Sequence, residues 1–177
     1  KIGDTALTDK FRIVFQDYNS NPLSINIKLI KVDNNSGYEI NFKAHDLNFK
    51  DIMTNKTFYI QNSNKFILLD FWGTWCKPCL DLLPNLKSIF KRYGGDKFNI
   101  YGIAHDDELS IVKNHLKSKN VVWPNVFDNR NSAELVNLYK VQSFPTFILI
   151  DPNGKIIYRG IGKSSLNHID KILSKLY

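Results

Sequence analysis

Cysteine is scarce in this chain, and that scarcity limits the chemistry open to it. The 177 residues include two cysteines and four histidines. The histidines are widely separated, with no paired spacing of the kind that zinc ligands show: His45, His105, His115 and His168. A structural zinc site needs four protein ligands and a catalytic site needs three. The sequence therefore predicts no zinc site and no other metal centre.

Long apolar runs and clustered charge are also absent. No apolar run approaches the roughly 20 residues that span a bilayer, so we expect no transmembrane helix. The net charge is +7, but the densest basic group (Lys87, Lys91 and Arg92) is expected on the solvated face of a helix. We therefore expect no nucleic-acid partner. The chain begins at Lys1 rather than at methionine, which suggests a removed leader or a trimmed chain.

Residues 1–43 show apolar side chains at every second position in three runs, "FRIVF", "LSINIKL" and "YEINF". The turn-forming stretches "NSNP" and "NNSG" separate these runs. This pattern predicts a small antiparallel β segment with three strands. The segment contains no cysteine and no cluster of acids or bases. We assign it no chemistry and leave its role open, with docking or the covering of a sheet edge as the expectation.

From residue 44 to residue 177 the pattern changes to alternating strands and helices, which predicts a second domain of the α/β class with a central mixed sheet flanked by helices. The run Phe66–Trp72 is apolar at almost every position, as in strands that are buried on both faces. We expect further strands at 58–60, 99–104 and 126–127, and a hairpin around "DPNG". Helices are expected after the cysteines, after Asp106 or Asp107, from a capping box at Asn131, and from Ser164 or Ser165.

The motif "CKPC" places both cysteines, Cys76 and Cys79, between the buried strand and the following helix. At a helix N-terminus, unpaired backbone N–H groups stabilise a thiolate and lower its pKa from about 8.5. Lys77 adds positive charge, and Pro78 is tolerated in the first helical turn. We expect Cys76 to be exposed and reactive, and Cys79 to be shielded one turn further on. A structural disulfide is the alternative, although so short a loop removes little entropy from the unfolded chain.

The segment "LLDFWGTWCKPC" resembles the active-site segment of the thioredoxin superfamily. Asp70 stands at the family's buried aspartate, Trp72 and Trp75 at its two tryptophans, and Pro84 at the proline that kinks its active-site helix. Downstream, "SFPTFILIDPNGK" is similar to the family's cis-proline loop and makes Pro145 the candidate cis residue. The stretch "IYGIAHDDELSIVKNHLKSKNVVWPNVFD" resembles the extracytoplasmic branch of TlpA-like and ResA-like oxidoreductases. The resemblance covers residues 44–177 and implies a thioredoxin-like fold.

The resemblance also implies a reaction in which Cys76 attacks a disulfide of a protein substrate and Cys79 resolves the mixed disulfide. Burial should raise the pKa of Asp70, which suits a proton acceptor for Cys79. The expected substrate-binding residues lie beside the dithiol and in the cis-proline loop: Trp75, Lys77, Pro78, Phe144 and Pro145. No cofactor is expected. The expected partners are protein disulfides and an electron donor, either a membrane-bound reductase or another dithiol protein, in the bacterial envelope.

Two positions depart from the family pattern. Many TlpA-like and ResA-like proteins carry a glutamate three residues after the second cysteine, where this chain has Leu82. That departure weakens a link to cytochrome c maturation. Cytosolic thioredoxins carry a lysine near the buried aspartate, and Gly102 aligns there. Three other functions stay open: a cytosolic thioredoxin-type electron donor, a non-catalytic binding module on a thioredoxin scaffold, and a peroxiredoxin. The intact CxxC motif and the absence of a further cysteine count against the last two.

Overall fold

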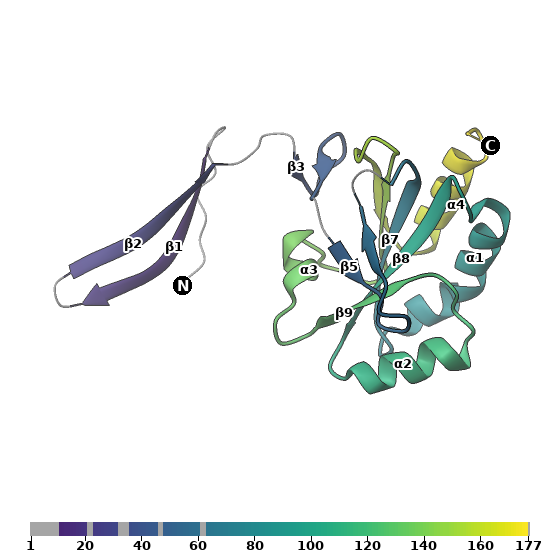
Figure 1. The fold of residues 1–177 in the computed structure, drawn as a ribbon, viewed down its shortest axis with the longest axis horizontal. Coiled ribbons are helices and arrows are strands. Elements are labelled where there is room, and N and C mark those ends of the chain that lie inside the picture. The colour runs from purple at the N-terminus through teal and green to yellow at the C-terminus, as the bar shows by residue number, and fades with distance from the viewer. Residues whose placement is uncertain (1–10, 21–22, 32–35, 46–47, 61–62, 177) are drawn as a thin grey trace. The chain divides into compact units, whose positions relative to one another are not determined.

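The structure, a computed structural model, describes residues 11–20, 23–31, 36–45, 48–60 and 63–176. The chain divides into two compact units, Lys1–Ser36 and Gly37–Tyr177. In the first unit, strands β1 (Phe11–Ser20) and β2 (Leu23–Lys31) pair as an antiparallel hairpin (Figure 1). A small antiparallel β segment is therefore present, as the alternating pattern predicts.

The third strand expected in this segment is wrong. Residues 38–42 form a turn between two short paired strands, β3 (Ser36–Gly37) and β4 (Lys43–Ala44). Asn41 has a positive φ of 79°, which a strand does not contain. The backbone N–H of Asn41 donates to the carbonyl of Ile156 at 2.9 Å. The turn thus belongs to the second unit, and its apolar alternation does not reflect strand pairing.

The second unit is built on a five-stranded mixed sheet with the strand order β11-β10-β7-β8-β9. Its three parallel strands are β7 (Phe66–Trp72), β8 (Phe98–Asp106) and β9 (Asn125–Asn129). The expected hairpin supplies the two antiparallel strands, β10 (Thr146–Ile150) and β11 (Ile156–Ile161). A further hairpin joins β5 (Asn48–Lys50) to β6 (Thr57–Tyr59).

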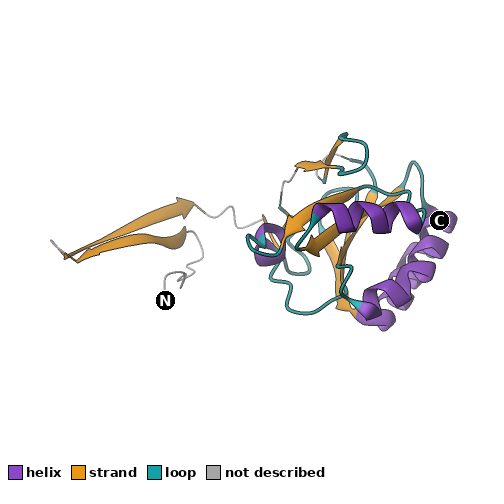
Figure 2. Cartoon of the chain, turned by 90° about the horizontal axis from the view of Figure 1, so that it is seen from below, coloured by secondary structure: helices purple, strands orange, loops and turns teal. Residues whose placement is uncertain are grey.

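Among the described residues, four helices pack around this sheet (Figure 2). They are α1 (Lys77–Tyr93), α2 (Leu109–Ser118), α3 (Glu134–Leu138) and α4 (Gly162–Leu173). No helix among the described residues combines the length and the apolar character that crossing a bilayer requires. The result is the mixed α/β architecture that the sequence predicts.

The side chains of β7 alternate between the two faces of the sheet, and this alternation positions the site. Leu68 packs in a core cluster with residues of α1 and α4, whereas Ile67, Leu69 and Phe71 pack in a second cluster with residues of β5 and α3. Asp70 is two residues after Leu68 and therefore lies on the α1 side of the sheet. The helix that follows β7 covers this acid.

The cap expected for α3 is also wrong. The residue before this helix is Ala133, not Asn131, and its side chain forms no cap hydrogen bond. The carboxylate of Asp128, on β9, instead accepts hydrogen bonds from the backbone N–H groups of Leu135 and Val136 at 3.0 and 3.2 Å. Asp128, near the end of β9, therefore caps the helix in place of the expected capping box at Asn131, because the connection from β9 brings its carboxylate to the helix N-terminus.

Candidate functional site

The two cysteines lie at the start of α1, where the sequence places them. Cys76 is the N-cap residue, and its sulfur accepts a hydrogen bond from the backbone N–H of Cys79 at 3.3 Å. The sulfurs form a disulfide with an S–S distance of 2.02 Å. The backbone N–H of Cys76 donates to the carbonyl of Gly73 at 3.1 Å, which holds the preceding loop against the helix start. Donation to the Cys76 sulfur favours a negative charge there once the disulfide is reduced.

The expected difference in exposure between the two cysteines is not seen. Cys76 is 4% exposed and Cys79 is 6% exposed, so both are buried in the disulfide form. The reason is packing: Cys76 belongs to an apolar cluster with Cys79 and Trp72, and Phe144 packs against this cluster. Any asymmetry between the sulfurs must come from their positions on the helix rather than from access to solvent.

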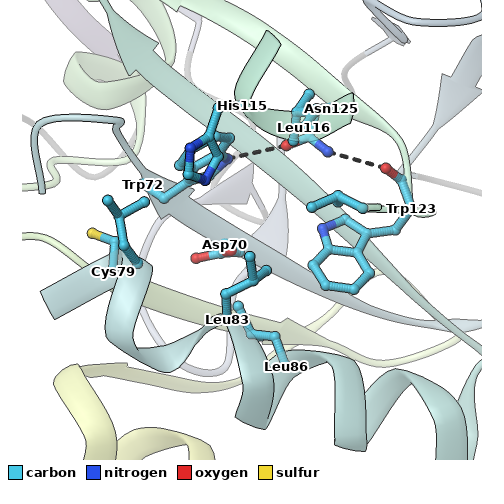
Figure 3. Close-up of a pocket in the computed structure, with 11 residues that line it drawn as sticks. Asp70, Trp72, Cys79, Leu83, Leu86, His115, Leu116, Trp123 and Asn125 are labelled. Carbon is cyan, nitrogen blue, oxygen red and sulfur yellow. Dashed lines mark hydrogen bonds between the residues drawn. The ribbon is translucent and has the colours of Figure 1, made fainter. Parts of the chain in front are cut away.

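Asp70 lies behind the disulfide and lines the same cavity as Cys79 (Figure 3). It is 5% exposed, and its Oδ1 has no hydrogen-bond partner among the described residues. Burial raises the pKa of Asp70 from 3.8 to about 7. A carboxyl with this pKa exchanges its proton near neutral pH, which is what a proton acceptor for a thiol requires.

The lysine of cytosolic thioredoxins has no counterpart here, and the sheet explains why. Asp70 pairs with Gly102 in the register of β7 and β8. A Cβ at Gly102 would overlap the Oδ1 of Asn125, whose side chain fills the space above the glycine. That Oδ1 accepts a hydrogen bond from the Trp72 Nε1 at 3.0 Å (Figure 3). A neutral amide therefore occupies this side of the cavity.

The cis-proline loop lies against the loop that precedes the dithiol. The peptide bond between Phe144 and Pro145 is cis. The ring of Phe144 contacts Trp75 edge-on at 5.2 Å between centroids and stacks on His105 at 5.4 Å. Trp75 is 48% exposed. An aromatic surface formed by the exposed Trp75 and the half-buried Phe144 thus lies next to the disulfide.

The two residues between the cysteines have exposed side chains. Lys77 has a side chain that is 83% exposed and forms an ion pair with Asp81 at 2.9 Å. Pro78 is exposed in the first turn of α1. Both residues are available to a partner molecule, but Asp81, one turn along the helix, partly neutralises the charge of Lys77.

Asp106 plays a different part from the one expected. The N-cap position of α2 is Glu108, neither Asp106 nor Asp107. The buried Asp106 carboxylate accepts hydrogen bonds from the backbone N–H and the hydroxyl of Thr74, both at 2.7 Å. The end of β8 therefore fixes the loop that carries Trp75 and leads into Cys76.

Three polar or aromatic residues that line the cavity are not predicted from the sequence as site residues: His115, Asn125 and Trp123. His115 lies on α2, three residues after the buried Val112 and one before the buried Leu116. That spacing places it on the apolar stripe of the helix, which is the one signal in the sequence that it faces the core. Asn125 and Trp123 carry no such signal, because their positions depend on the neighbouring strand. Among the described residues, no cluster of three or more potential metal ligands occurs.

Comparison with known proteins places this site in a family context. A model of the thioredoxin-like family matches residues 64–156. A thiol-disulfide oxidoreductase ResA of Bacillus thuringiensis is 32% identical over 136 residues, which cover 77% of this chain and 75% of that protein. ResA of Bacillus subtilis is 31% identical over 117 residues, which cover 66% of this chain and 62% of that protein.

Solved structures agree with these matches. A thiol-disulfide oxidoreductase from Bacteroides fragilis superposes with a TM-score of 0.64 at 27% identity, covering 74% of this chain and 98% of that chain. StoA of Bacillus subtilis superposes with a TM-score of 0.62 at 22% identity, covering 72% of this chain and 95% of that chain. At this identity the match supports the fold alone.

Proposed function

The chain belongs to the thioredoxin-like family and is a protein disulfide oxidoreductase, and from that premise we propose that its Cys76–Cys79 dithiol reduces disulfide bonds of proteins in the bacterial envelope. The observation that carries the proposal is the arrangement of the cysteines. Cys76 caps a helix, and Cys79 shares a cavity with a buried acid whose pKa is close to neutral.

The reaction begins with the reduced dithiol. The Cys76 thiolate attacks one sulfur of the substrate disulfide, a new S–S bond forms, and the second substrate sulfur leaves as a thiolate that takes up a proton. The helix N-terminus favours Cys76 as this nucleophile, because its sulfur accepts the N–H of Cys79.

Resolution uses Cys79. Its thiol gives a proton to the Asp70 carboxylate, and the Cys79 thiolate attacks the Cys76 sulfur of the mixed disulfide. The Cys76–Cys79 disulfide forms, and the substrate leaves with both of its sulfurs reduced. An electron donor must then return two electrons and two protons to the protein. We propose a membrane-bound or other dithiol protein as this donor.

Substrate binding is assigned to the aromatic surface and the cis-proline loop. Within the described residues the carbonyl of Pro145 accepts a hydrogen bond from Gly162, whereas the backbone N–H and C=O of Phe144 form none. The Phe144 backbone can therefore pair with an extended substrate segment, as an added strand does at a sheet edge. Trp75 would contact side chains of that segment.

We do not extend the proposal to apocytochrome c. The position at which many relatives carry a glutamate is Leu82, which is buried against the core. Leu82 therefore supplies no carboxyl group near the dithiol. Among the described residues, Asp70 is the one carboxyl that lines the cavity beside Cys79.

Reduction of insulin by dithiothreitol, followed as turbidity, tests the proposal. The wild-type protein should accelerate the reaction, and the Cys76→Ser/Cys79→Ser double variant, which has no dithiol and is checked for folding by circular dichroism, should not. If the wild-type protein is folded and the rate equals that of dithiothreitol alone, the proposal is wrong and the cysteine pair is a structural disulfide.

A further inference from the structure

The cavity behind the disulfide brings together titratable groups from three elements (Figure 3). Asp70 comes from β7, Cys79 from α1 and His115 from α2. Leucine side chains of α1 form much of the remaining wall. The reaction proposed above uses Asp70 and Cys79 but assigns no part to His115.

The cavity has room for a water molecule. Its free volume is about 20 Å³, and one water needs at least about 10–15 Å³ and two or more polar partners. Asp70 offers its Oδ1, which is buried and without a partner among the described residues. His115 offers a ring nitrogen, since no hydrogen bond to its ring occurs within the part of the chain that the structure describes. A water in this cavity would give both groups a hydrogen-bond partner.

The surroundings of His115 keep its ring available to accept a proton. Burial lowers the pKa of His115, Lys119 lowers it further, and Asp106 opposes the change. The His115 ring lines the same cavity as Asp70 and Cys79 (Figure 3). Because the pKa lies below its ordinary value of about 6.5, the imidazole is neutral at neutral pH.

Packing alone does not account for this arrangement. The His115 ring lies 5.5 Å from the ring of Trp72 and could serve only as a spacer. A spacer would leave the buried carboxyl of Asp70 with no route for its proton, because the lining near it is apolar apart from Cys79, His115, Asn125 and the two tryptophans. The Asn125 amide already accepts from Trp72 and donates to the carbonyl of Trp123.

We propose that His115 is the group through which Asp70 exchanges its proton with solvent, by way of a water molecule held in the cavity. The inference rests on the proposed function, because it concerns the proton that Cys79 releases. In the resolving step Cys79 gives its proton to Asp70, and Asp70 passes a proton to the water. The water passes one to the neutral His115 ring, which releases it to solvent from its half-buried position. No electrons move in this transfer.

Reaction of the reduced protein with Ellman's disulfide, followed by stopped-flow absorbance, separates the two steps. The first release of thionitrobenzoate reports attack by Cys76, and the second reports resolution by Cys79. His115→Gln and His115→Phe remove the proton acceptor, and the phenylalanine keeps a ring against Trp72. His168→Gln, on the exposed side of α4, is the matched control.

At about pH 8, both His115 variants should slow the second phase roughly tenfold and leave the first phase unchanged. A tenfold effect is a modest part of the rate enhancement that general acid–base catalysis contributes. The difference should shrink well below pH 6.5, where the wild-type ring is protonated and cannot accept. Added imidazole should restore part of the rate of a His115→Ala variant. His168→Gln should behave as wild type.

Three results overturn the inference or its premise, and they are distinguishable. A second phase that His115→Gln and His115→Phe leave unchanged at every pH refutes the relay while the oxidoreductase stands. Slowing by His115→Gln alone, with normal kinetics in His115→Phe and no rescue by imidazole, assigns His115 a packing role and also refutes it. A wild-type protein that shows no second phase removes the premise itself.

Discussion

Replacement of Asp70 by asparagine should stabilise the oxidised protein at neutral and alkaline pH. The pKa of this carboxyl is about 7 in the folded protein against 3.8 ordinarily, and burial is the cause. Each pKa unit corresponds to about 1.4 kcal/mol, so ionising the buried group costs about 4 kcal/mol of folding stability. Asparagine has nearly the same shape and does not ionise, and it removes this cost.

The sign follows from proton binding. Because the folded-state pKa is raised, the folded protein holds a proton on Asp70 between about pH 4 and pH 7 that the unfolded chain has released. Wild-type stability is therefore fully present below about pH 4 and falls by about 1.4 kcal/mol per pH unit up to about pH 7. The gain from Asp70→Asn should be near zero at the acid end and level off at about 4 kcal/mol above pH 7.

Urea unfolding of the oxidised wild type and Asp70→Asn across this pH range measures the difference directly. Asp51→Asn is the matched control, because Asp51 is equally buried but accepts hydrogen bonds from Thr54 and from the backbone of Asn125. It should lose stability, by about 1–3 kcal/mol. A stability difference between Asp70→Asn and wild type that does not change with pH would refute the reasoning on Asp70.

Three further outcomes are expected. Gly102→Ala should lower the free energy of unfolding in urea by about 1–3 kcal/mol, because the new Cβ overlaps the Asn125 Oδ1. The double variant Gly102→Ala/Asn125→Ala should lose less than the sum of the two single changes. Strict additivity would contradict the overlap. A chain that begins at Gly37 should keep insulin reductase activity. One that begins at Ala44 loses the hydrogen bond from the Asn41 N–H to the Ile156 carbonyl and the one from the Ile156 N–H to the Phe42 carbonyl, and it should be less stable. Trp75→Ala should slow insulin reduction while changing stability by less than about 1 kcal/mol, since the side chain is half exposed.

Local patterns in the sequence predict much of the fold and the centre of the site. The buried strand Phe66–Trp72 and the helix after Cys76 are confirmed, because hydrophobic periodicity and helix-start chemistry act within a few residues. The expected order of strands and helices in the second unit is confirmed as well. Asp70 was recognisable as a buried acid because it interrupts an apolar run.

The features that sequence reasoning missed depend on packing and backbone geometry that hydrophobic periodicity does not describe. Cys76 is buried because Phe144 packs against its cluster, and periodicity around the cysteines contains no information about that contact. Asp106 binds Thr74 because the end of β8 lies beside a loop 32 residues earlier in the chain. Asp128 caps α3 from the preceding strand, β9, rather than from the position next to the helix. Alternating apolar residues predict a strand at the turn around Asn41, because the pattern contains no information about the positive φ of that residue.

Trapping of mixed disulfides tests most directly that Cys76 attacks and Cys79 resolves. Cys79→Ser retains the nucleophile at the helix N-cap but cannot release a bound substrate. When it is produced in the envelope of a bacterium, it should accumulate covalent complexes with other proteins, visible on a non-reducing gel and cleared by dithiothreitol. Cys76→Ser should trap far less, because the remaining thiol lies inside the helix. Better trapping by Cys76→Ser, or equal trapping by both, would contradict the assignment of attacker and resolver.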